Sequence, residues 1–181
     1  MAVKLVALDI DGTIVQPQTG DSPTPRLKAA VAAAQEAGIA VVLASGRMFP
    51  GTASVAQDLG LTGWVICQQG CGIHTMTGEM LHEFPIDHDR AMHIIDYAKS
   101  IDRAYEWFSP LRYIASRQSY HTDAYGSVSG ITPEYHPFPE RSGMRPTGVG
   151  IISTKDEAPV IHRALSSHHG EALHLLDFPE V

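Results

Sequence analysis

Two carboxylates, one residue apart, close the first apolar segment of the chain. Asp9 and Asp11 follow the apolar run of residues 3–8, and Gly12 and Thr13 come directly after them. Two ionised carboxylates this close repel each other, and a bound cation can hold both of them in place. Carboxylates also act as nucleophiles and as general acids or bases. An ordinary Asp-Gly turn would explain Asp11 and Gly12 but would leave Asp9 without a role.

A second polar group follows the next apolar run in the same way. Residues 39–44 are apolar, and Ser45, Gly46 and Arg47 come after them. The hydroxyl of Ser45 could hydrogen-bond a phosphate oxygen. Arg47 could clamp an anion with its forked guanidinium, or it could pair with a surface carboxylate. Ser-Gly taken alone is an ordinary turn, so its position after the strand carries the interpretation.

The elements between these groups predict how they are positioned. Thr24 and Pro25 are typical of the start of a helix, and Gly38 is typical of its end. The uninterrupted apolar runs of residues 3–8 and 39–44 favour strands that are buried on both faces of a parallel sheet. A strand, helix and strand with short connections form a right-handed parallel crossover. Both strands should therefore end at the same edge of the sheet, where ligands of α/β proteins collect.

The same reasoning predicts local geometry at the first strand end. If the strand continues to Asp11, then Asp9 and Asp11 point to the same face, because side chains alternate along a strand. Gly12 would permit a sharp turn and would leave backbone N–H groups free to meet an anion.

The segment Asp9-Ile10-Asp11-Gly12-Thr13 resembles the first signature of the haloacid dehalogenase superfamily in its Asp-x-Asp-x-Thr phosphatase form. The resemblance implies that Asp9 is a nucleophile that forms an aspartyl-phosphate, and that Asp11 is the general acid and base. Ser45 stands at the position of the second signature, and Ser-Gly-Arg is the form usual in the Cof-type branch. The Cof-type pattern continues with an Asn-Gly-Ala-like turn, where this chain has Gln69-Gly70-Cys71.

The resemblance also implies a Mg²⁺ ion as cofactor, held by the carboxylate of Asp9 and the main-chain carbonyl of Asp11. The residues that would contact the substrate phosphate are Gly12, Thr13, Ser45, Gly46 and Arg47. In fold, it implies an α/β protein with a Rossmann-like parallel sheet core, present in part, and an inserted α+β cap domain. We expect the core in residues 1–82 and the cap in residues 83–181.

Hydrophobic spacing predicts the remaining elements. Helices are expected at 52–59, 87–99 and 155–167, strands at 64–67, 105–108, 113–115, 148–153 and 173–176, and a loop at 122–145. The two later helices should cover one face of the second sheet.

Composition narrows the class of protein. The 181 residues include 13 basic and 20 acidic ones, for a net charge of −7, which argues against a basic surface that binds nucleic acid. No apolar stretch is long enough to span a bilayer, and the first residues lack the pattern of a signal peptide. The sequence therefore predicts a cytoplasmic location without a membrane partner.

The cysteines and histidines suggest a metal site only weakly. Cys67, Cys71 and His74 lie close in sequence, but a structural zinc site needs four ligands and no second pair is evident. Cys67 is better explained as a small buried strand residue. The ten histidines are expected mainly at the surface, with His168 and His169 near a helix end, where positive charge is favourable.

Two further signatures of the superfamily, a lysine and an acidic Gly-Asp-x-x-x-Asp cluster, have no clear match. Lys155 falls at the start of a predicted helix, so a solvent-exposed position is expected. Asp177 and Glu180 follow an apolar run but lack the glycine and the second aspartate. Without the strands that accompany these signatures, the first strand would present an open edge, which favours self-association.

Together these features predict a Mg²⁺-dependent phosphatase that acts on a small phosphorylated metabolite, such as a sugar phosphate, through an aspartyl-phosphate. A sugar phosphomutase would use the same paired aspartates. A non-catalytic module that binds a phosphorylated metabolite or another protein is the alternative of a different class.

Overall fold

The structure is a computed structural model that describes residues 2–16 and 22–177. Its helices are α1 (Pro25–Glu36), α2 (Phe49–Asp58), α3 (His88–Ser100), α4 (Tyr120–Ser129) and α5 (Ala158–His169). Its strands are β1 (Leu5–Leu8), β2 (Ala40–Leu43), β3 (Trp64–Cys67), β4 (Gly72–Thr75), β5 (Met80–Glu83), β6 (Tyr105–Ser109), β7 (Arg112–Ala115), β8 (Glu134–Tyr135) and β9 (Gly148–Ile151). Short 3₁₀ segments lie at Gln68–Gly70, Pro139–Ser142 and Gly170–Ala172.

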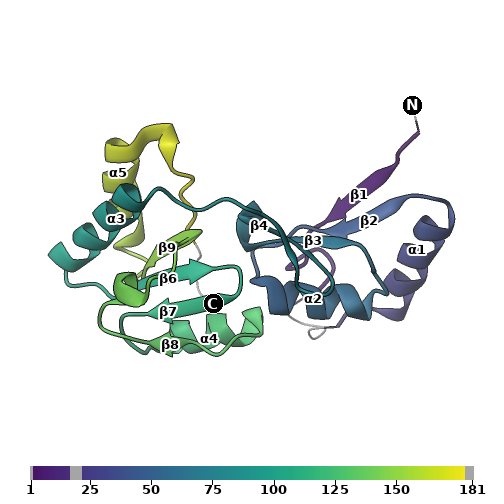
Figure 1. Ribbon diagram of the computed structural model, residues 1–181, viewed down its shortest axis with the longest axis horizontal. Helices are drawn as coiled ribbons and strands as arrows, with labels where there is room; N and C mark the ends of the chain where they lie inside the picture. Colours follow the sequence, from purple (N-terminus) through teal and green to yellow (C-terminus); the bar gives the residue numbers. More distant parts are fainter. Residues whose placement is uncertain (1, 17–21, 178–181) are drawn as a thin grey trace.

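The first part of the chain forms the parallel crossover that the sequence predicts. β1 pairs with β2 in parallel, with Leu8 opposite Leu43, and a parallel bridge from Ala44 to Ile66 joins the end of β2 to β3. Thr24 caps α1 by accepting a hydrogen bond from the N–H of Leu27. In Figure 1, the arrows of β1 and β2 point from the right-hand end toward the middle of the molecule.

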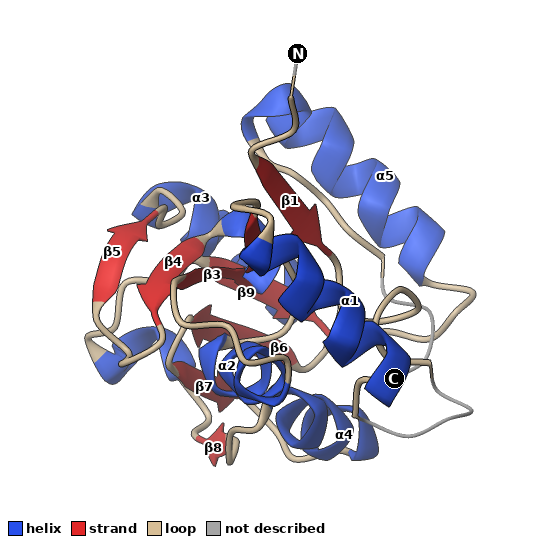
Figure 2. Cartoon of the chain, turned by 90° about the vertical axis from the view of Figure 1, so that its right-hand side faces the viewer, coloured by secondary structure: helices blue, strands red, loops and turns tan. Residues whose placement is uncertain are grey.

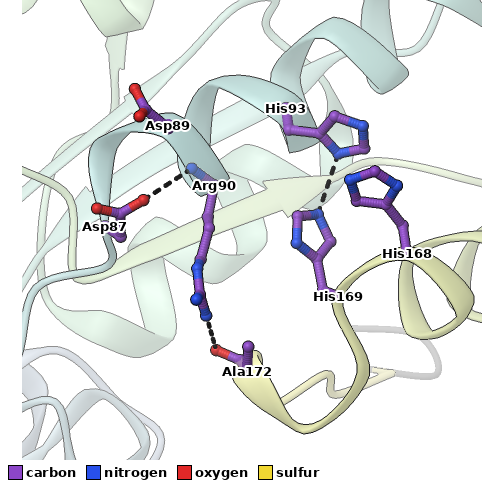
Figure 3. A pocket seen from close by; sticks show the side chains of 7 residues that line it. All are labelled: Asp87, Asp89, Arg90, His93, His168, His169 and Ala172. Carbon is purple, nitrogen blue, oxygen red and sulfur yellow. Dashed lines mark hydrogen bonds between the residues drawn. The ribbon is translucent and has the colours of Figure 1, made fainter.

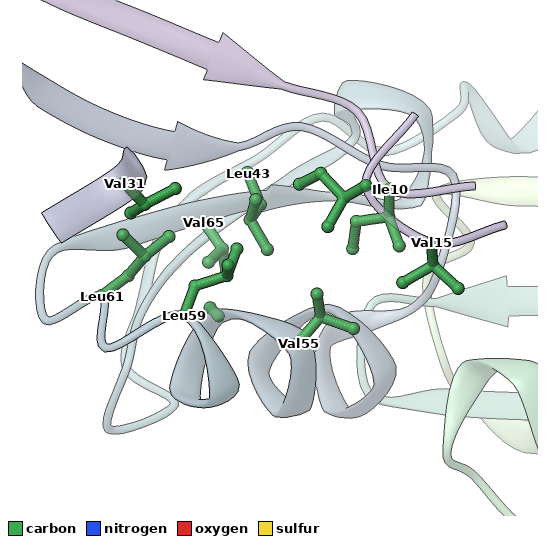
Figure 4. Close-up of a cluster of buried hydrophobic side chains, with 10 residues drawn as sticks. Ile10, Val15, Val31, Leu43, Val55, Leu59, Leu61 and Val65 are labelled. Atoms are coloured by element: carbon green, nitrogen blue, oxygen red, sulfur yellow. The ribbon is translucent and has the colours of Figure 1, made fainter. Parts of the chain in front are cut away.

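Helices α1 and α2 pack on one face of these strands and enclose the first hydrophobic core. Figure 4 shows the buried side chains, which come from both helices, from β2 and β3, and from the turn after β1. Leu43 and Val65 have no exposed surface, and Val31 and Val55 are each 4% exposed. This core fixes the strand ends that carry the candidate site.

The other face of β1 is uncovered, which corrects the prediction of burial on both faces. Leu5 is 46% exposed and Ala7 is exposed, whereas Val6 and Leu8 on the opposite face are half-buried. Within the described residues, β1 pairs only with β2, and no helix packs on its outer face. An apolar run predicts a strand, but its burial requires neighbouring elements that cover both faces.

A three-stranded antiparallel sheet, in the order β3-β4-β5, follows the crossover. Figure 2 shows β5 at the outer edge of this sheet, beside β4. The chain then enters α3 and the second half of the molecule. The boundary expected after residue 82 falls inside β5, and the division into two domains stays a prediction.

The second half is built on a four-stranded sheet in the order β8-β7-β6-β9. On one face, Tyr105 and Trp107 of β6 pack with Ala91 and Ile95 of α3. Helix α5 packs beside α3 through a second apolar cluster, composed of Ile94, Ile161 and Leu165. The molecule is therefore an α/β protein with a Rossmann-like partial core and an α+β cap.

Helix α4 corrects two predictions, because residues 122–145 were expected to be a loop and the sheet was expected to be covered on one face only. Ser119 and Thr122 form a reciprocal capping box, and Gly130, with φ of 65°, ends the helix. Tyr125 of this helix packs with Tyr113 of β7 and with Met48 on the second face of the sheet. Glycines and serines suggested a loop, but caps at both ends and tertiary packing favour the helix.

Residues 173–176 are not a strand, which corrects the last predicted element. They follow the 3₁₀ segment at Gly170–Ala172, and Leu173 and Leu175 pack against the cluster formed by α3 and α5. Among the described residues, no strand pairs with this segment, so its apolar side chains are buried by helix packing instead.

Across residues 2–16 and 22–177, none of the helices is both long and apolar enough to cross a membrane.

Candidate active site

The ends of β1, β2 and β3 bring the predicted site residues to one edge of the core. The N–H of Ala44 donates to the carbonyl of Leu8 over 2.9 Å, and the N–H of Ser45 donates to the carbonyl of Ile66 over 3.0 Å. Asp9 therefore follows β1 beside the segment that carries Ser45, and Gln68 follows β3. The predicted common edge is confirmed.

Asp9 and Asp11 are both exposed, while Ile10 between them is fully buried in the first core. The strand ends at Leu8, so the condition under which Asp9 and Asp11 would point to the same face is not met. A tight turn replaces it, in which the carbonyl of Ile10 accepts hydrogen bonds from the N–H groups of Thr13, Ile14 and Val15. Because Ile10 anchors this turn, both carboxylates are held on the outside of the core.

Gly12 adopts the left-handed conformation, with φ of 77°, as the predicted sharp turn requires. Its N–H does not point to an open anion site, however. It donates to the carbonyl of Val15 over 2.8 Å, and the N–H of Thr13 donates to Ile10 over 3.2 Å. The turn satisfies its own donors, which corrects the expectation of free N–H groups at Gly12. Thr13 itself is exposed.

Arg47 reaches across from the end of β2 and binds Asp11 with both arms of its guanidinium. Nε donates to Oδ2 over 2.9 Å and Nη2 donates to Oδ1 over 2.6 Å. The side chain of Arg47 is 9% exposed and that of Asp11 is 54% exposed. Of the two roles considered for Arg47, this geometry corresponds to the pairing with a carboxylate. The carboxylate is the predicted general acid, so the pair lies within the candidate site and not elsewhere on the surface.

Ser45 and Gly46 form a tightly packed turn at the same edge. Ser45 is 5% exposed, and its Oγ accepts a hydrogen bond from the N–H of Arg47 over 3.2 Å. A Cβ atom placed on Gly46 would lie 2.2 Å from Nε2 of Gln69. The carboxamide of Gln69 therefore covers Gly46, and a larger residue there would displace it.

The two glutamines after β3 are features that the sequence reasoning missed. Gln68 and Gln69 both have positive φ, of 50° and 56°, which is uncommon for residues other than glycine. The buried Gln68 accepts a hydrogen bond from Oγ1 of Thr147 over 2.5 Å, and Thr147 directly precedes β9. This contact ties the candidate site to the second sheet. The departure of Gln69 from the Asn-Gly-Ala-like pattern was the available signal.

The donor atoms at this edge suit a hard cation. Asp9 and Asp11 offer carboxylate oxygens at the surface, and Mg²⁺ is commonly held by one or two carboxylates together with water and substrate phosphate. Within the described ranges, no group of three or more His, Cys, Asp or Glu ligands gathers at this edge. The fit is therefore to a cation that keeps much of its water, as the predicted Mg²⁺ would.

The remaining candidates lie outside the site. Burial raises the pKa of the Cys67 thiol to about 12, and its Sγ contacts the carbonyl of Gly72 at 3.4 Å, which confirms a buried strand cysteine. Lys155 is exposed ahead of α5. Asp177 lies 3.0 Å from Nδ1 of His162, and it follows no strand. Glu180 lies outside the described residues.

Comparison with known proteins agrees with this arrangement. The sequence profile of the haloacid dehalogenase-like hydrolases matches residues 6–178. The chain is 34% identical over 107 residues to the phosphatase YwpJ of Bacillus subtilis, a match that covers 59% of this chain and 37% of that protein.

Solved structures give the same picture at the level of the fold. A haloacid dehalogenase-like hydrolase of Bacteroides thetaiotaomicron superposes with a TM-score of 0.82 at 17% identity, over 97% of this chain and 68% of its own. A subclass IIB sugar phosphatase of the superfamily superposes with a TM-score of 0.73 at 17% identity, over 90% and 64%. The profile match spans nearly the whole chain and includes the strand ends that carry Asp9, Asp11 and Ser45, and the chain belongs to the haloacid dehalogenase-like hydrolase family.

Proposed function

We propose that this protein is a Mg²⁺-dependent phosphatase that hydrolyses the phosphate monoester of a small metabolite through an aspartyl-phosphate on Asp9. The observation that carries the proposal is the position of Asp9. It is an exposed carboxylate at the carboxyl end of β1, beside the end of β2 that carries Ser45 and Arg47. A nucleophile here can approach a phosphate that Ser45 and Arg47 contact from the neighbouring strand end.

In the proposed reaction, a carboxylate oxygen of Asp9 attacks phosphorus and the bond to the ester oxygen breaks. Asp11 donates its proton to that oxygen, and the alcohol leaves. Asp11 then removes a proton from a water molecule, which attacks phosphorus and releases phosphate from Asp9. Each proton that Asp11 gives in the first step is regained in the second, so the enzyme returns to its starting state.

The pair of Arg47 and Asp11 sets a condition on this cycle. Both carboxylate oxygens of Asp11 accept hydrogen bonds from the guanidinium, so Asp11 must separate from Arg47 and take up a proton from solvent before it can act as the general acid. A phosphate dianion offers the guanidinium a competing bidentate partner. We propose that substrate binding exchanges one pair for the other and thereby frees Asp11.

Mg²⁺, held by the carboxylate of Asp9 and the main-chain carbonyl of Asp11, would neutralise charge on the transferred phosphoryl group. The similarity to the phosphatase of Bacillus subtilis supports phosphate-ester hydrolysis, and the sugar phosphatase of the same fold motivates the substrate class, a small phosphorylated metabolite such as a sugar phosphate. A cytoplasmic location is proposed with it, because phosphorylated metabolites of this kind are made inside cells.

The test is a phosphatase assay of the purified chain with Mg²⁺, using p-nitrophenyl phosphate and a set of sugar phosphates. We expect the variant Asp9→Asn to lose turnover completely, because its amide cannot attack phosphorus. The exposed aspartate Asp58, at the end of α2, provides the matched control Asp58→Asn, which should keep parental activity. Thermal unfolding of both variants should match the parent.

Beryllofluoride, which mimics an aspartyl-phosphate, separates the alternatives. With Mg²⁺ it should bind the parent and not Asp9→Asn. Turnover by Asp9→Asn would contradict the covalent mechanism. Binding of sugar phosphates by a parent that does not turn them over would instead identify a non-catalytic binding module, and transfer of phosphate between sugar positions would identify a phosphomutase.

A further inference from the structure

Three histidines meet at the end of the molecule where α3 and α5 pack together. His93 comes from α3, and His168 and His169 come from the last turn of α5 (Figure 3). Nδ1 of His93 lies 3.0 Å from Nε2 of His169, in a hydrogen bond. The ring of His93 stacks on that of His168, with centroids 3.9 Å apart and planes inclined by 10°. One ring nitrogen from each of the three lies within 4.8 Å of the others.

This grouping is not explained by the candidate active site. Figure 1 shows α3 and α5 at the left-hand end of the molecule, whereas β1 and β2 lie at the right. Within the described residues, the three histidines are the only group of three or more His, Cys, Asp or Glu side chains whose ligand atoms converge. They line a surface hollow of about 430 Å³ that also includes Asp89 and Arg90.

We propose that His93, His168 and His169 bind a divalent transition-metal ion of the zinc type. Neutral imidazole is a preferred ligand of zinc, copper and nickel, and three histidines leave a fourth position open. In this site the open position faces the hollow, where a water molecule can complete a tetrahedron. The ion would join the two helices.

The local geometry and the dipole of α5 favour a metal ion at this place. Nδ1 of His93 and Nε2 of His169 share one hydrogen bond, so one of these two nitrogens acts as the acceptor and presents a lone pair. His168 and His169 also form the carboxyl-terminal turn of α5, where the helix dipole favours positive charge. A single divalent ion coordinated by three imidazole nitrogens would place positive charge at this end of α5, where the helix dipole stabilises it.

Coordination requires a small rearrangement of side chains. Nitrogens about 2.0–2.1 Å from one zinc ion lie about 3.3 Å apart in a tetrahedron, close to the separation of 3.0 Å already present between His93 and His169. The metal would replace the hydrogen bond between them. Two parallel rings cannot both direct in-plane lone pairs at one ion, so His168 must turn out of its stack on His93. Its side chain is exposed, which permits this movement.

The first experiment is a titration of the tag-free chain with Zn²⁺ by isothermal calorimetry. We expect one ion per chain and a rise in Tm, since the ion binds the folded state only. His93→Ala and His168→Ala each remove a ligand, and each should weaken Zn²⁺ binding by more than the roughly 10–100-fold typical of a lost outer partner. The control His88→Ala changes an exposed histidine on the same helix and should bind as the parent does.

Two further variants test whether Zn²⁺ binds at the cysteines or at the candidate active site instead. Cys71→Ser and Asp9→Asn should both retain parental Zn²⁺ affinity. Co²⁺ should show the intense visible absorption of a tetrahedral site in the parent, and His168→Ala should lose it. The proposal is overturned if the parent binds no stoichiometric zinc, if His93→Ala and His168→Ala bind as tightly as the parent, or if binding is lost with Cys71→Ser instead.

Discussion

Strands β1 and β6 are both short and largely apolar, yet they are packed in opposite ways. On one face of β1, Leu8 packs against the first core, and the other face is uncovered, with Leu5 46% exposed. β6 is a central strand between β7 and β9, and Trp107 on it is 1% exposed. Side chains cover both faces of that sheet, from α3 on one side and from α4 and Met48 on the other.

The two strands therefore differ in role: the end of β1 carries the candidate catalytic residues, whereas β6 belongs to the buried core of the second sheet. The candidate nucleophile and acid lie just beyond the end of β1, where the chain leaves the core and its carboxylates are exposed. The second sheet instead carries buried aromatic side chains, and the hydrogen bond of Gln68 with Thr147 connects it to the candidate site. We expect substitutions near β1 to alter activity with little change in stability, and substitutions around β6 to do the reverse.

After the complete loss expected for Asp9→Asn, the largest expected effect is on Asp11. Asp11→Asn should lower turnover about 10²–10⁴-fold, because it removes the group that protonates the leaving oxygen and activates water. Attack by Asp9 on an ester with a good leaving group should persist, so aspartyl-phosphate should accumulate and be detected by mass spectrometry. Asn still accepts a hydrogen bond from Arg47, and thermal stability should change little. Equal rates for the parent and the variant, on activated and ordinary esters alike, would remove Asp11 from the mechanism.

The next largest expected effect is on the free energy of unfolding, which tests the contribution of the core around β6. Ile95 of α3 has no exposed surface, and Ile95→Ala should lower the free energy of unfolding by about 2–5 kcal/mol through lost packing and a cavity. Leu5→Ala on β1 should change it by no more than about 0.5 kcal/mol. Urea unfolding followed by circular dichroism measures both. If the two variants were equally destabilised, the contrast between the two strands would not hold.

A half-buried carboxyl on the second sheet should make the stability depend on pH. Desolvation raises the pKa of Glu106 from 4.5 to about 7, although Tyr113 donates a hydrogen bond to it. Between these pH values the folded chain binds the extra proton, so the free energy of unfolding should fall as pH rises through this window, by about 1.4 kcal/mol per pKa unit.

Glu106→Gln keeps the acceptor for Tyr113 and removes the charge. The variant should be more stable than the parent at pH 8 and should match it near pH 4, when both are compared by urea unfolding. The exposed Glu36 at the end of α1 provides the control Glu36→Gln, which should reproduce the parental pH profile. If the free energy of unfolding of Glu106→Gln fell with pH as steeply as that of the parent, the pH dependence would belong to another group.

The smallest expected effect concerns association. Within the described residues, β1 is hydrogen-bonded only to β2, and Val3 and Leu5 are 64% and 46% exposed. An open apolar edge of this kind favours pairing between copies of the chain. Leu5→Lys places a charge there and should shift the chain toward monomer in light scattering. Leu111→Lys serves as a control. Leu111 is also 46% exposed, but it lies in the turn between β6 and β7 and not at an open sheet edge. A parent that is already monomeric at high concentration would refute the proposed edge.

The sequence by itself determined the local elements around the site. The apolar runs, the cap at Thr24 and the glycine at Gly38 specify strand, helix and strand through interactions within a few residues, and the ends of these strands meet at one edge as predicted. Helix α3 and the strands β6 and β7 were also predicted, because their apolar spacing matches the faces that they bury. Each of these features depends on short-range geometry.

Tertiary structure alone decided the rest. Whether β1 is covered depends on which elements pack over it, and the spacing of its own residues does not contain that information. The pairing of Arg47 with Asp11 likewise joins residues that are 36 positions apart in the sequence. The packing of α4 on Tyr113 also requires contacts between distant segments. The meeting of His93 with His168 and His169 is of the same kind, because 75 residues separate the two helices' histidines in sequence and only the packing of α3 on α5 brings them together.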